Sequence, residues 1–175
     1  MKTSSAPPPL LKRRLFLLVL VAAIFLPRAL PIGRFATIDE HVWLIRTLKF
    51  QRAISQRDFV QTYQSVHPGV TTMGIGALAL TWEFPGSAAV ATDGVGVGDF
   101  EEFLLAYGHR PLDLLVKSRL LMILANTAIL VASFSYAWRL LGWRPASFAF
   151  FLIAFSPFYA AHTQVVHVDG LLSSL

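Results

Sequence analysis

Three long apolar runs alternate with polar segments along the chain, over about residues 15–33, 119–141 and 147–166. The second run carries no charge between its first residue and Arg139, and the third carries no formal charge at all. A helix of about 20 residues can cross a hydrocarbon core of roughly 30 Å, since each residue adds about 1.5 Å. The pattern therefore predicts three membrane-spanning helices, the last of them kinked at Pro157.

The first apolar run admits two interpretations. Its uninterrupted core covers only residues 15–26, and basic residues precede it, which is also typical of a cleaved signal peptide. We favour a span, because no A-x-A cleavage site is evident and the side chain of Arg28 can extend to the far interface. Residues 1–14 hold four of the fifteen Lys and Arg residues and are then predicted to be a cytoplasmic basic tail.

Residues 67–84 are apolar and about as long as a short span, but they are rich in Gly and Thr. If they cross the membrane, residues 85–118 face the cytoplasm with five acids against two bases, and the turn holding Arg139 and Arg144 faces outwards. Both placements oppose the rule that cytoplasmic loops are positive. If they do not cross, residues 34–118 form one outer loop, the turn is cytoplasmic, and both loops obey the rule. We favour this second arrangement.

The segment DEHVWLIRTLKFQRAIS, residues 39–55, predicts a helix at the membrane surface. Its two leading acids suit a helix N-terminus, where the dipole favours anions. Arg46, Lys49 and Arg52 recur every three residues, and Trp43 begins an apolar side. Helices of this kind lie in the headgroup plane. The predicted fold class is therefore all-α, with polytopic membrane helices and an extracytoplasmic juxtamembrane helix after the first span.

Composition supports an integral membrane protein and excludes several other classes. The chain of 175 residues is 55% hydrophobic and 14% charged, with a mean hydropathy of +0.58. An average soluble domain carries roughly 25% charged residues. The net charge of +5 is not gathered in a polar patch, so nucleic acid is not an expected partner. The absence of cysteine excludes disulfides and thiolate chemistry.

The adjacent acids Asp39 and Glu40 are the first candidate for chemistry. Neighbouring residues of a helix point about 100° apart, so one acid can face a site while the other caps or orients. The functional interpretation is a general base or a ligand for a hard divalent cation. The structural alternative is a helix cap with a carboxylate in the first turn.

The remaining candidates lie at the predicted outer ends of the spans. His167 and Asp169 follow the third span, on the side predicted for Asp39, and the alternative is a polar cluster at a helix end. His67 stands in a His-Pro-Gly turn and could contact phosphate or metal, or simply form the turn. Arg119 opens the second span, where a cation serves either lipid headgroups or a lipid-linked phosphate.

The order of these features resembles the amino-terminal part of the GT-C-fold membrane glycosyltransferases. A basic tail, one span, an acidic pair that opens an amphipathic helix, and His-Pro before a Gly-rich apolar segment succeed one another. The segments SRLLMILANTAIL, RLLGWRPAS and SPFYAAHTQVVHVDGLL continue the match. The protein mannosyltransferases and the lipid A aminoarabinose transferases are the most similar members. The resemblance covers residues 15–175, about the first third of such a protein.

The resemblance implies a mechanism. The donor would be a sugar on a polyprenyl phosphate in the outer leaflet, and the carboxylate matching Asp39 would activate the acceptor hydroxyl. We add the neighbouring Glu40 to the catalytic residues. Asp169 matches a second outer acid that shapes the donor or a metal site. His67 stands near a polar position of the donor pocket, although this chain has His-Pro-Gly where protein mannosyltransferases tend to have His-Pro-Pro. We add Arg119 and His167 to the substrate-binding residues.

The sequence therefore predicts a multi-pass protein of the cell membrane with a cytoplasmic amino terminus. Its expected partners are a polyprenyl-phosphate-linked sugar, membrane lipid and an unidentified acceptor. A divalent metal ion is a candidate cofactor, and the sequence does not decide whether one is needed. We expect a fragment that is inactive alone, because further spans would complete the groove. The alternatives are a transporter-like protein and a non-catalytic membrane protein in which the acids are helix caps.

Overall fold

The computed structural model describes residues 10–66, 69–90, 92 and 94–174. Within these residues the chain is all-helical and contains no strand, which confirms the predicted all-α class. The elements are α1 (Leu10–Ala29), α2 (Ile38–Ser55), α3 (Val70–Glu83), the 3-10 helix η1 (Ser87–Ala89), α4 (Phe100–Ala106), α5 (Pro111–Leu141), α6 (Trp143–Ala154), α7 (Pro157–Gln164) and α8 (Val168–Leu172).

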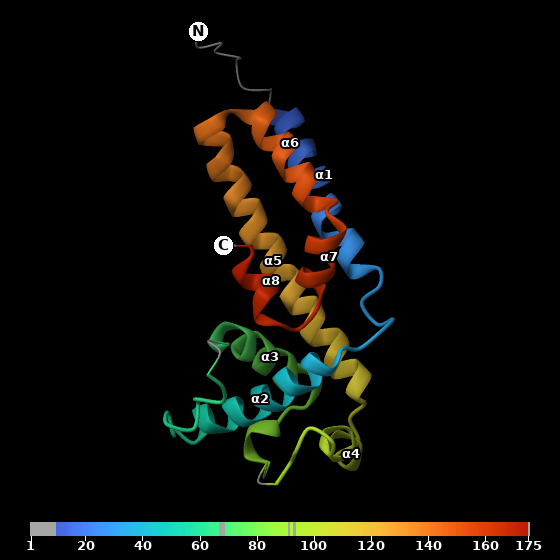
Figure 1. Cartoon of the computed structure of the whole chain (residues 1–175), viewed down its shortest axis with the longest axis vertical. Helices are drawn as coiled ribbons and strands as arrows, with labels where there is room; N and C mark the ends of the chain where they lie inside the picture. Colours follow the sequence, from blue (N-terminus) through green and yellow to red (C-terminus); the bar gives the residue numbers. More distant parts are fainter. Residues whose placement is uncertain (1–9, 67–68, 91, 93, 175) are drawn as a thin grey trace.

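The long helix α5 forms the axis of the molecule (Figure 1). It has 31 residues, and Pro111 stands in its first turn, where the missing N–H of proline costs nothing. It ends at Gly142, whose φ of 86° is readily adopted by glycine. The helix begins before residue 119, where the predicted span begins, because the buried Leu114 and Leu115 continue the apolar pattern. α5 is long and apolar enough to cross a membrane.

The third predicted span is a broken helix. α6 and α7 meet at an angle of 67°, and only together are they long and apolar enough to cross a membrane. Pro157 begins α7 rather than merely kinking one helix, and the Ser156 hydroxyl caps α7 by accepting a hydrogen bond from the Tyr159 amide at 3.4 Å. The described residues thus contain one helix that can span a membrane, or two if the bent pair counts as one span.

The first predicted span differs most from expectation. α1 begins inside the predicted tail and ends before residue 33, and it is not among the helices long and apolar enough to span. Its apolar core is short, with basic residues before it and Arg28 in its last turn. Arg28 does not extend to an interface as predicted, because its side chain is fully buried between helices. Residues 1–9 of the predicted tail lie outside the described residues.

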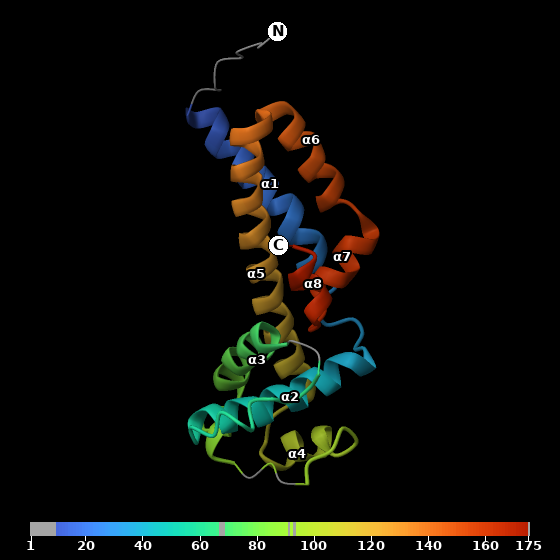
Figure 2. The same ribbon diagram turned by 60° about the vertical axis from the view of Figure 1, so that its left-hand side comes forward.

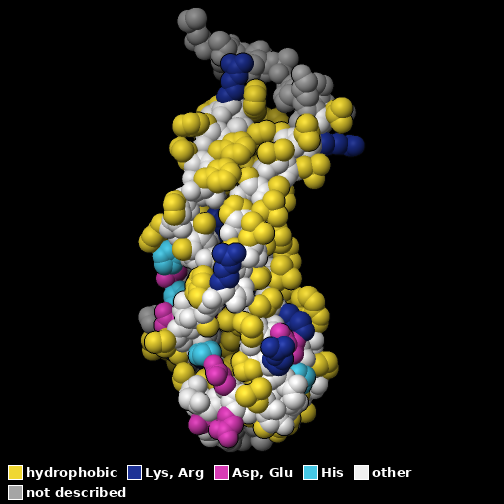
Figure 3. Space-filling view, turned by 90° about the vertical axis from the view of Figure 1, so that its right-hand side faces the viewer, with side chains coloured by type: hydrophobic (Ala, Val, Ile, Leu, Met, Phe, Trp, Pro, Cys, Tyr) yellow, Lys and Arg dark blue, Asp and Glu magenta, His cyan; other side chains and the backbone are white. Residues whose placement is uncertain are grey.

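Two hydrophobic cores divide the molecule along α5 (Figure 2). One core lies between α1, α6 and the carboxyl-terminal half of α5, around Ile24, Phe134 and Phe150. We call this the apolar half. The other lies between α2, α3, α4, α8 and the amino-terminal half of α5, around Leu48 and Leu80. We call this the polar half, because most of the acids and histidines visible in Figure 3 lie on it.

Within the ambiguous segment 67–84, residues Val70–Glu83 form α3, which packs along α2 in the polar half (Figures 1 and 2). With 14 residues it is about 21 Å long, shorter than a hydrocarbon core of roughly 30 Å. Gly76 lets the two helices approach closely, since a Cβ there would lie 2.5 Å from the Thr47 hydroxyl. The predicted surface helix 39–55 corresponds to α2, but its side chains are more buried than those of a helix lying in headgroups.

Hydrophobic side chains cover most of the apolar half, whereas Lys and Arg mark its far end (Figure 3). Large exposed apolar residues on α1, α5 and α6 account for this surface: Leu15, Leu18, Leu26, Leu124, Tyr136, Leu140, Phe148 and Leu152. An exposed apolar surface of this extent is typical of contact with lipid or with further helices. The candidate site lies at the border between this surface and the polar half.

Candidate active site

Glu40 and Arg119 form a fully buried ion pair where α2 crosses α5. The Arg119 Nε lies 2.7 Å from Glu40 Oε1, and Arg119 Nη2 lies 2.6 Å from Glu40 Oε2. The two side chains are 0% and 1% exposed. This two-point geometry fixes the orientation of both planes, which a lysine could not do.

Further hydrogen bonds join this ion pair to two other segments. The Thr37 amide and hydroxyl donate to Glu40 Oε2 at 3.0 and 3.1 Å, as the Thr-x-x-Glu spacing at the start of α2 favours. The Val166 amide donates to Glu40 Oε1 at 3.0 Å, and Arg119 Nη1 donates to the Ile32 carbonyl at 2.7 Å. The pair therefore holds together the segment after α1, α2, α5 and the α7–α8 link.

The environment keeps Glu40 ionised. Burial alone would raise the pKa of the Glu40 carboxyl, but the hydrogen bonds from Arg119, Val166 and Thr37, with the positive charge of Arg119, lower it below its ordinary value. Both carboxylate oxygens are already engaged, so Glu40 is poorly placed to take a proton from a substrate. Arg119 is likewise enclosed, because all three guanidinium nitrogens donate within the protein.

Asp39, the neighbour of Glu40 in the same helical turn, is exposed to solvent. It lines a cleft of about 270 Å³ together with Asp169, His162 and His167. Phe35 and Thr37 form one wall of this cleft, and residues from α7 and the α7–α8 link form the other. The structure thus brings Asp39 and Asp169 to one cleft although 129 residues separate them in the sequence.

Asp169 and His167 form a local unit at the start of α8. His167 Nδ1 accepts a hydrogen bond from the Asp169 amide at 3.3 Å and lies 3.2 Å from Asp169 Oδ2. The Asp169 side chain is 60% exposed. Gly170 permits this arrangement, since a Cβ there would lie 2.6 Å from the His162 carbonyl oxygen. The edge of the His167 ring meets Trp43 of α2, with ring centroids 5.9 Å apart.

The structure separates the predicted site residues into two groups. Asp39, His167 and Asp169 line the cleft, whereas Glu40 and Arg119 lie in the buried network behind it. Neither Glu40 as a catalytic acid nor Arg119 as a phosphate ligand fits this enclosed position. His67 lies outside the described residues. His162 was not predicted, and the only signal for it was its place five residues before His167, in a segment otherwise poor in polar groups.

A metal ion finds no ready set of ligands in the described part of the chain. No group of three or more His, Asp or Glu side chains there comes close enough to hold one. The cleft supplies two separate acids and two histidines, but they do not converge. We therefore derive no chemical step through a metal.

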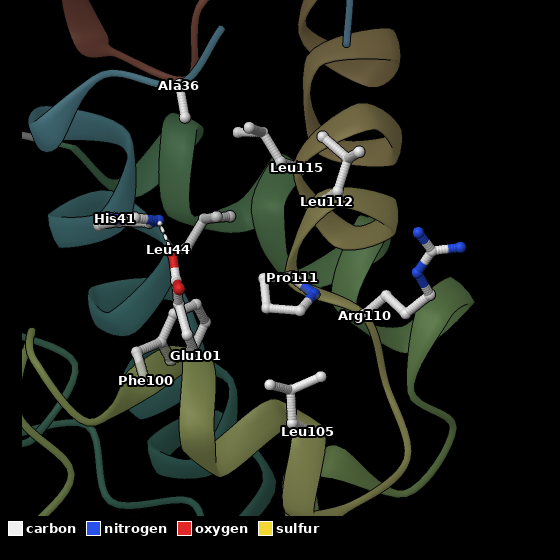
Figure 4. Close-up of a pocket in the computed structure, with 10 residues that line it drawn as sticks. All are labelled: Ala36, His41, Leu44, Phe100, Glu101, Leu105, Arg110, Pro111, Leu112 and Leu115. Atoms are coloured by element: carbon white, nitrogen blue, oxygen red, sulfur yellow. Dashed lines mark ion pairs between the residues drawn. The ribbon is translucent and has the colours of Figure 1, made fainter.

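A second pocket, of about 320 Å³, lies between α2, α4 and α5 (Figure 4). Leu44, Phe100 and Leu115 are among its apolar walls, and His41 Nε2 pairs with Glu101 Oε1 at 3.1 Å on one side. Ala36 lines this pocket, while its two neighbours in sequence line the Asp39 cleft. The segment before α2 therefore lies between the two pockets.

Comparison of the chain with protein-family models, curated proteins and solved structures finds no match. The function must therefore be argued from the site itself.

Proposed function

We propose that this chain forms the amino-terminal part of an inverting, GT-C-like membrane glycosyltransferase. The protein would move a sugar from a polyprenyl-phosphate donor to an acceptor hydroxyl on the outer face of the cell membrane. One observation carries the proposal: Asp39 and Asp169 line one cleft at the border between the polar half and an apolar surface suited to contact with lipid. A lipid-linked sugar has to react at such a border, because its chain lies in the bilayer and its sugar in water.

The proposed topology has three crossings and a cytoplasmic amino terminus. α1, α5 and the broken α6–α7 helix would cross the membrane, and the polar half would lie outside. The length of α5 and of the bent pair supports two of these crossings, and the short α3 packed on α2 supports one continuous outer segment. The basic turn with Arg139 and Arg144 then faces the cytoplasm, as the positive-inside rule favours.

Asp39 acts as the general base in this proposal. Its carboxylate takes the proton of the acceptor hydroxyl while that oxygen forms a bond to the anomeric carbon of the donor sugar. The bond from the anomeric carbon to the phosphate oxygen breaks, and the polyprenyl phosphate leaves with the electron pair. A single displacement of this kind inverts the anomeric configuration. Asp39 is exposed to the cleft, as a base that meets a substrate has to be.

The buried pair of Glu40 and Arg119 is assigned a positioning role. It fixes the first turn of α2, which carries Asp39, against α5 and the α7–α8 link, which leads into the first turn of α8 with Asp169. Rigid placement of reacting groups can supply a large part of a rate enhancement. Asp169, His167 and His162 offer hydrogen-bond acceptors and donors that suit sugar hydroxyls.

The test is sugar transfer by membranes that contain the protein expressed from its native gene. Radiolabelled polyprenyl-phosphate sugars serve as donors, and the release of polyprenyl phosphate is measured. We expect Asp39→Asn to lower transfer by about 10²–10⁴-fold, the usual contribution of a general base. Asp58→Asn is the matched control, since Asp58 is an exposed acid of the polar half outside the cleft. Equal activity of the two variants would refute the assignment, and folded wild type without transfer from any donor would favour a non-catalytic protein.

A further inference from the structure

Arg28 is a buried cation to which the described part of the chain offers no counter-charge. Its side chain is 0% exposed, at the end of α1. Its Nε donates to the Thr163 hydroxyl at 2.6 Å, and its Nη1 donates to the Ile24 carbonyl at 2.5 Å and the Ala154 carbonyl at 3.4 Å. Its Nη2 has no hydrogen-bond partner among the described residues, and none of their carboxylates forms an ion pair with it. Buried charges are ordinarily paired, because burial without a partner is costly.

A cavity of about 470 Å³ lies beside this cation, between α5, α6, α7 and the end of α8. Leu130, Phe150 and Ile153 give it apolar walls. Residues with hydroxyl groups also line it, namely Ser133, Ser156, Tyr159, Ser173 and Ser174. Leu152, which also lines it, is largely exposed on the apolar surface, so the cavity adjoins the region where lipid would lie.

Tyr159 connects the cation with the cavity. The Arg28 guanidinium lies 5.4 Å from the centre of the Tyr159 ring, and the same ring lines the cavity. The Tyr159 hydroxyl lies 2.5 Å from the Ser174 hydroxyl, which bonds in turn to Asn126 Oδ1 at 2.8 Å. Tyr159 is thus the side chain that contacts both the guanidinium and the cavity, and contact of a bound phosphate with Arg28 requires this side chain to rotate.

We propose that this cavity binds an anionic phospholipid, with one hydrocarbon chain along its apolar walls and the phosphate between the hydroxyls and Arg28. Charge selects this occupant, since no carboxylate of the described residues pairs with Arg28 and its Nη2 remains to donate to a phosphate oxygen. The apolar walls select a chain rather than a free ion. The inference does not depend on sugar transfer, because none of these residues lines the Asp39 cleft.

The arrangement of apolar and polar residues around the cavity agrees with the orientation of a lipid in one leaflet of the membrane. Leu130 and Phe150 belong to the core of the apolar half, whereas Ser156 lies in the break between α6 and α7. Tyr159 follows the break and packs against the edge of the same core. A chain directed into the apolar half and a phosphate at the break reproduce the orientation of a lipid at that border. Polar groups at a broken membrane helix are ordinarily satisfied by protein or by a bound ligand.

A purely structural role for Arg28 is the rival explanation. Its Nη1 donates to the carbonyl of Ala154, the last residue of α6. The last carbonyls of a helix have no hydrogen-bond partner within the helix itself. A guanidinium that only caps α6 would need no phosphate, so lipids with and without phosphate would bind alike.

Phosphorus NMR on the purified full chain in maltoside micelles tests the proposal. Dodecyl phosphate is the probe, inorganic phosphate is titrated separately, and dodecanol serves as a competitor without a phosphate. We expect a saturable bound resonance for dodecyl phosphate only. Arg28→Met should weaken its binding by at least about tenfold, as expected for loss of a charge-assisted contact.

A cavity-filling pair keeps the test independent of Arg28. Ser133→Phe places a large side chain in the lining of the cavity, whereas Ser135→Phe places the same side chain at an exposed position of α5 outside it. We expect only Ser133→Phe to abolish binding, with both variants folded by circular dichroism. Unchanged binding in Ser133→Phe, complete displacement by equimolar dodecanol, or equal binding of inorganic phosphate would each overturn the proposal.

Discussion

Glu40 and Arg119 meet in a two-point ion pair that is buried at the crossing of α2 and α5, 2.6 Å apart at Nη2 and Oε2. The pair stands directly behind Asp39, one residue earlier in α2. Its contacts reach the Ile32 carbonyl and the Val166 amide, so both walls of the Asp39 cleft depend on it. Within one helical turn, the enclosed Glu40 thus stabilises the fold, whereas the exposed Asp39 faces the cleft.

Breaking this pair on one side should destabilise the protein strongly. Arg119→Ala leaves a buried carboxylate without its partner, and we expect a loss of about 3–5 kcal/mol in the free energy of unfolding. Arg119→Lys should recover only part of this loss, because an ammonium cannot make both contacts. The measurement is denaturant unfolding in detergent, followed by circular dichroism.

The double variant separates the role of the pair from the cost of an orphaned charge. Glu40→Leu with Arg119→Leu removes both charges, and such exchanges are often neutral or stabilising. We expect its stability to lie nearer to wild type than that of Arg119→Ala. If the loss of stability in the double variant equalled the sum of the losses in the two single variants, the two side chains would not be directly coupled.

Acid should destabilise the protein through Glu40 and a second carboxyl, Glu83. Burial alone would raise the pKa of Glu83, but its contacts with Lys117 and His109 lower it below the ordinary value of 4.5. A carboxyl with a lowered pKa binds its proton less tightly when folded than when unfolded. Its stabilising contribution is therefore present at neutral pH and is lost as the pH falls below about 4.5.

The unfolding temperature between pH 7 and pH 3 checks this expectation. We expect a steady fall on the acid side, and a shallower fall in Glu83→Gln, which removes one titrating group but keeps a hydrogen-bond partner for Lys117. A Glu83→Gln curve parallel to that of wild type would show that Glu83 contributes nothing to the pH dependence.

The sequence predicted those elements that local pattern determines. The apolar periodicity located α2 and most of α5, and Pro157 located the break between α6 and α7. Because neighbouring residues of a helix point about 100° apart, the sequence also predicted that Asp39 and Glu40 would have different surroundings. It did not indicate which acid would be buried, because that depends on the approach of Arg119 and Val166, far away in the sequence.

Tertiary packing decided what the sequence analysis missed. Arg28 looked like a residue at an interface, since its neighbours are apolar and a long side chain can usually reach water. The packing of α7 and the α6 terminus around it encloses the guanidinium instead. His162 carried no distinct local signal, and only the close approach of α8 at Gly170 brings it beside Asp169.

Gly170→Ala should displace Asp169 in the cleft while lowering the stability of the protein only moderately. A Cβ at this position would lie 2.6 Å from the His162 carbonyl oxygen and 3.2 Å from the Thr163 Cα, and neither backbone atom can move freely. We expect a loss of about 1–3 kcal/mol in stability and a displacement of Asp169. Gly98→Ala is the control, because a Cβ there meets nothing within 4 Å.

Transfer activity and unfolding together measure the effect of Gly170→Ala. Under the proposed function, this variant should lose most of its sugar transfer at temperatures where it remains folded, while Gly98→Ala keeps its activity. Full activity in folded Gly170→Ala would show that the position of Asp169 does not matter for transfer.

Labelling of single cysteines tests whether the two cleft acids face the same side of the membrane. The natural chain has no cysteine, so each introduced thiol reports alone. Asp39→Cys, Gly96→Cys and Asp169→Cys sample the polar half, and Leu141→Cys samples the turn at the other end of α5, where Leu141 is exposed. Leu141 is preferable to Gly142, whose positive φ a side chain would strain.

We expect a membrane-impermeant maleimide to label the first three positions in intact cells and to label Leu141→Cys only after the membrane is permeabilised. This result follows if α3 stays on the outer side and α5 crosses. If Gly96→Cys were protected and Leu141→Cys labelled, segment 67–84 would cross the membrane and the outer placement of the polar half would be wrong. If Asp39→Cys and Asp169→Cys differed in access, the two acids could not share the cleft on which the proposed function depends.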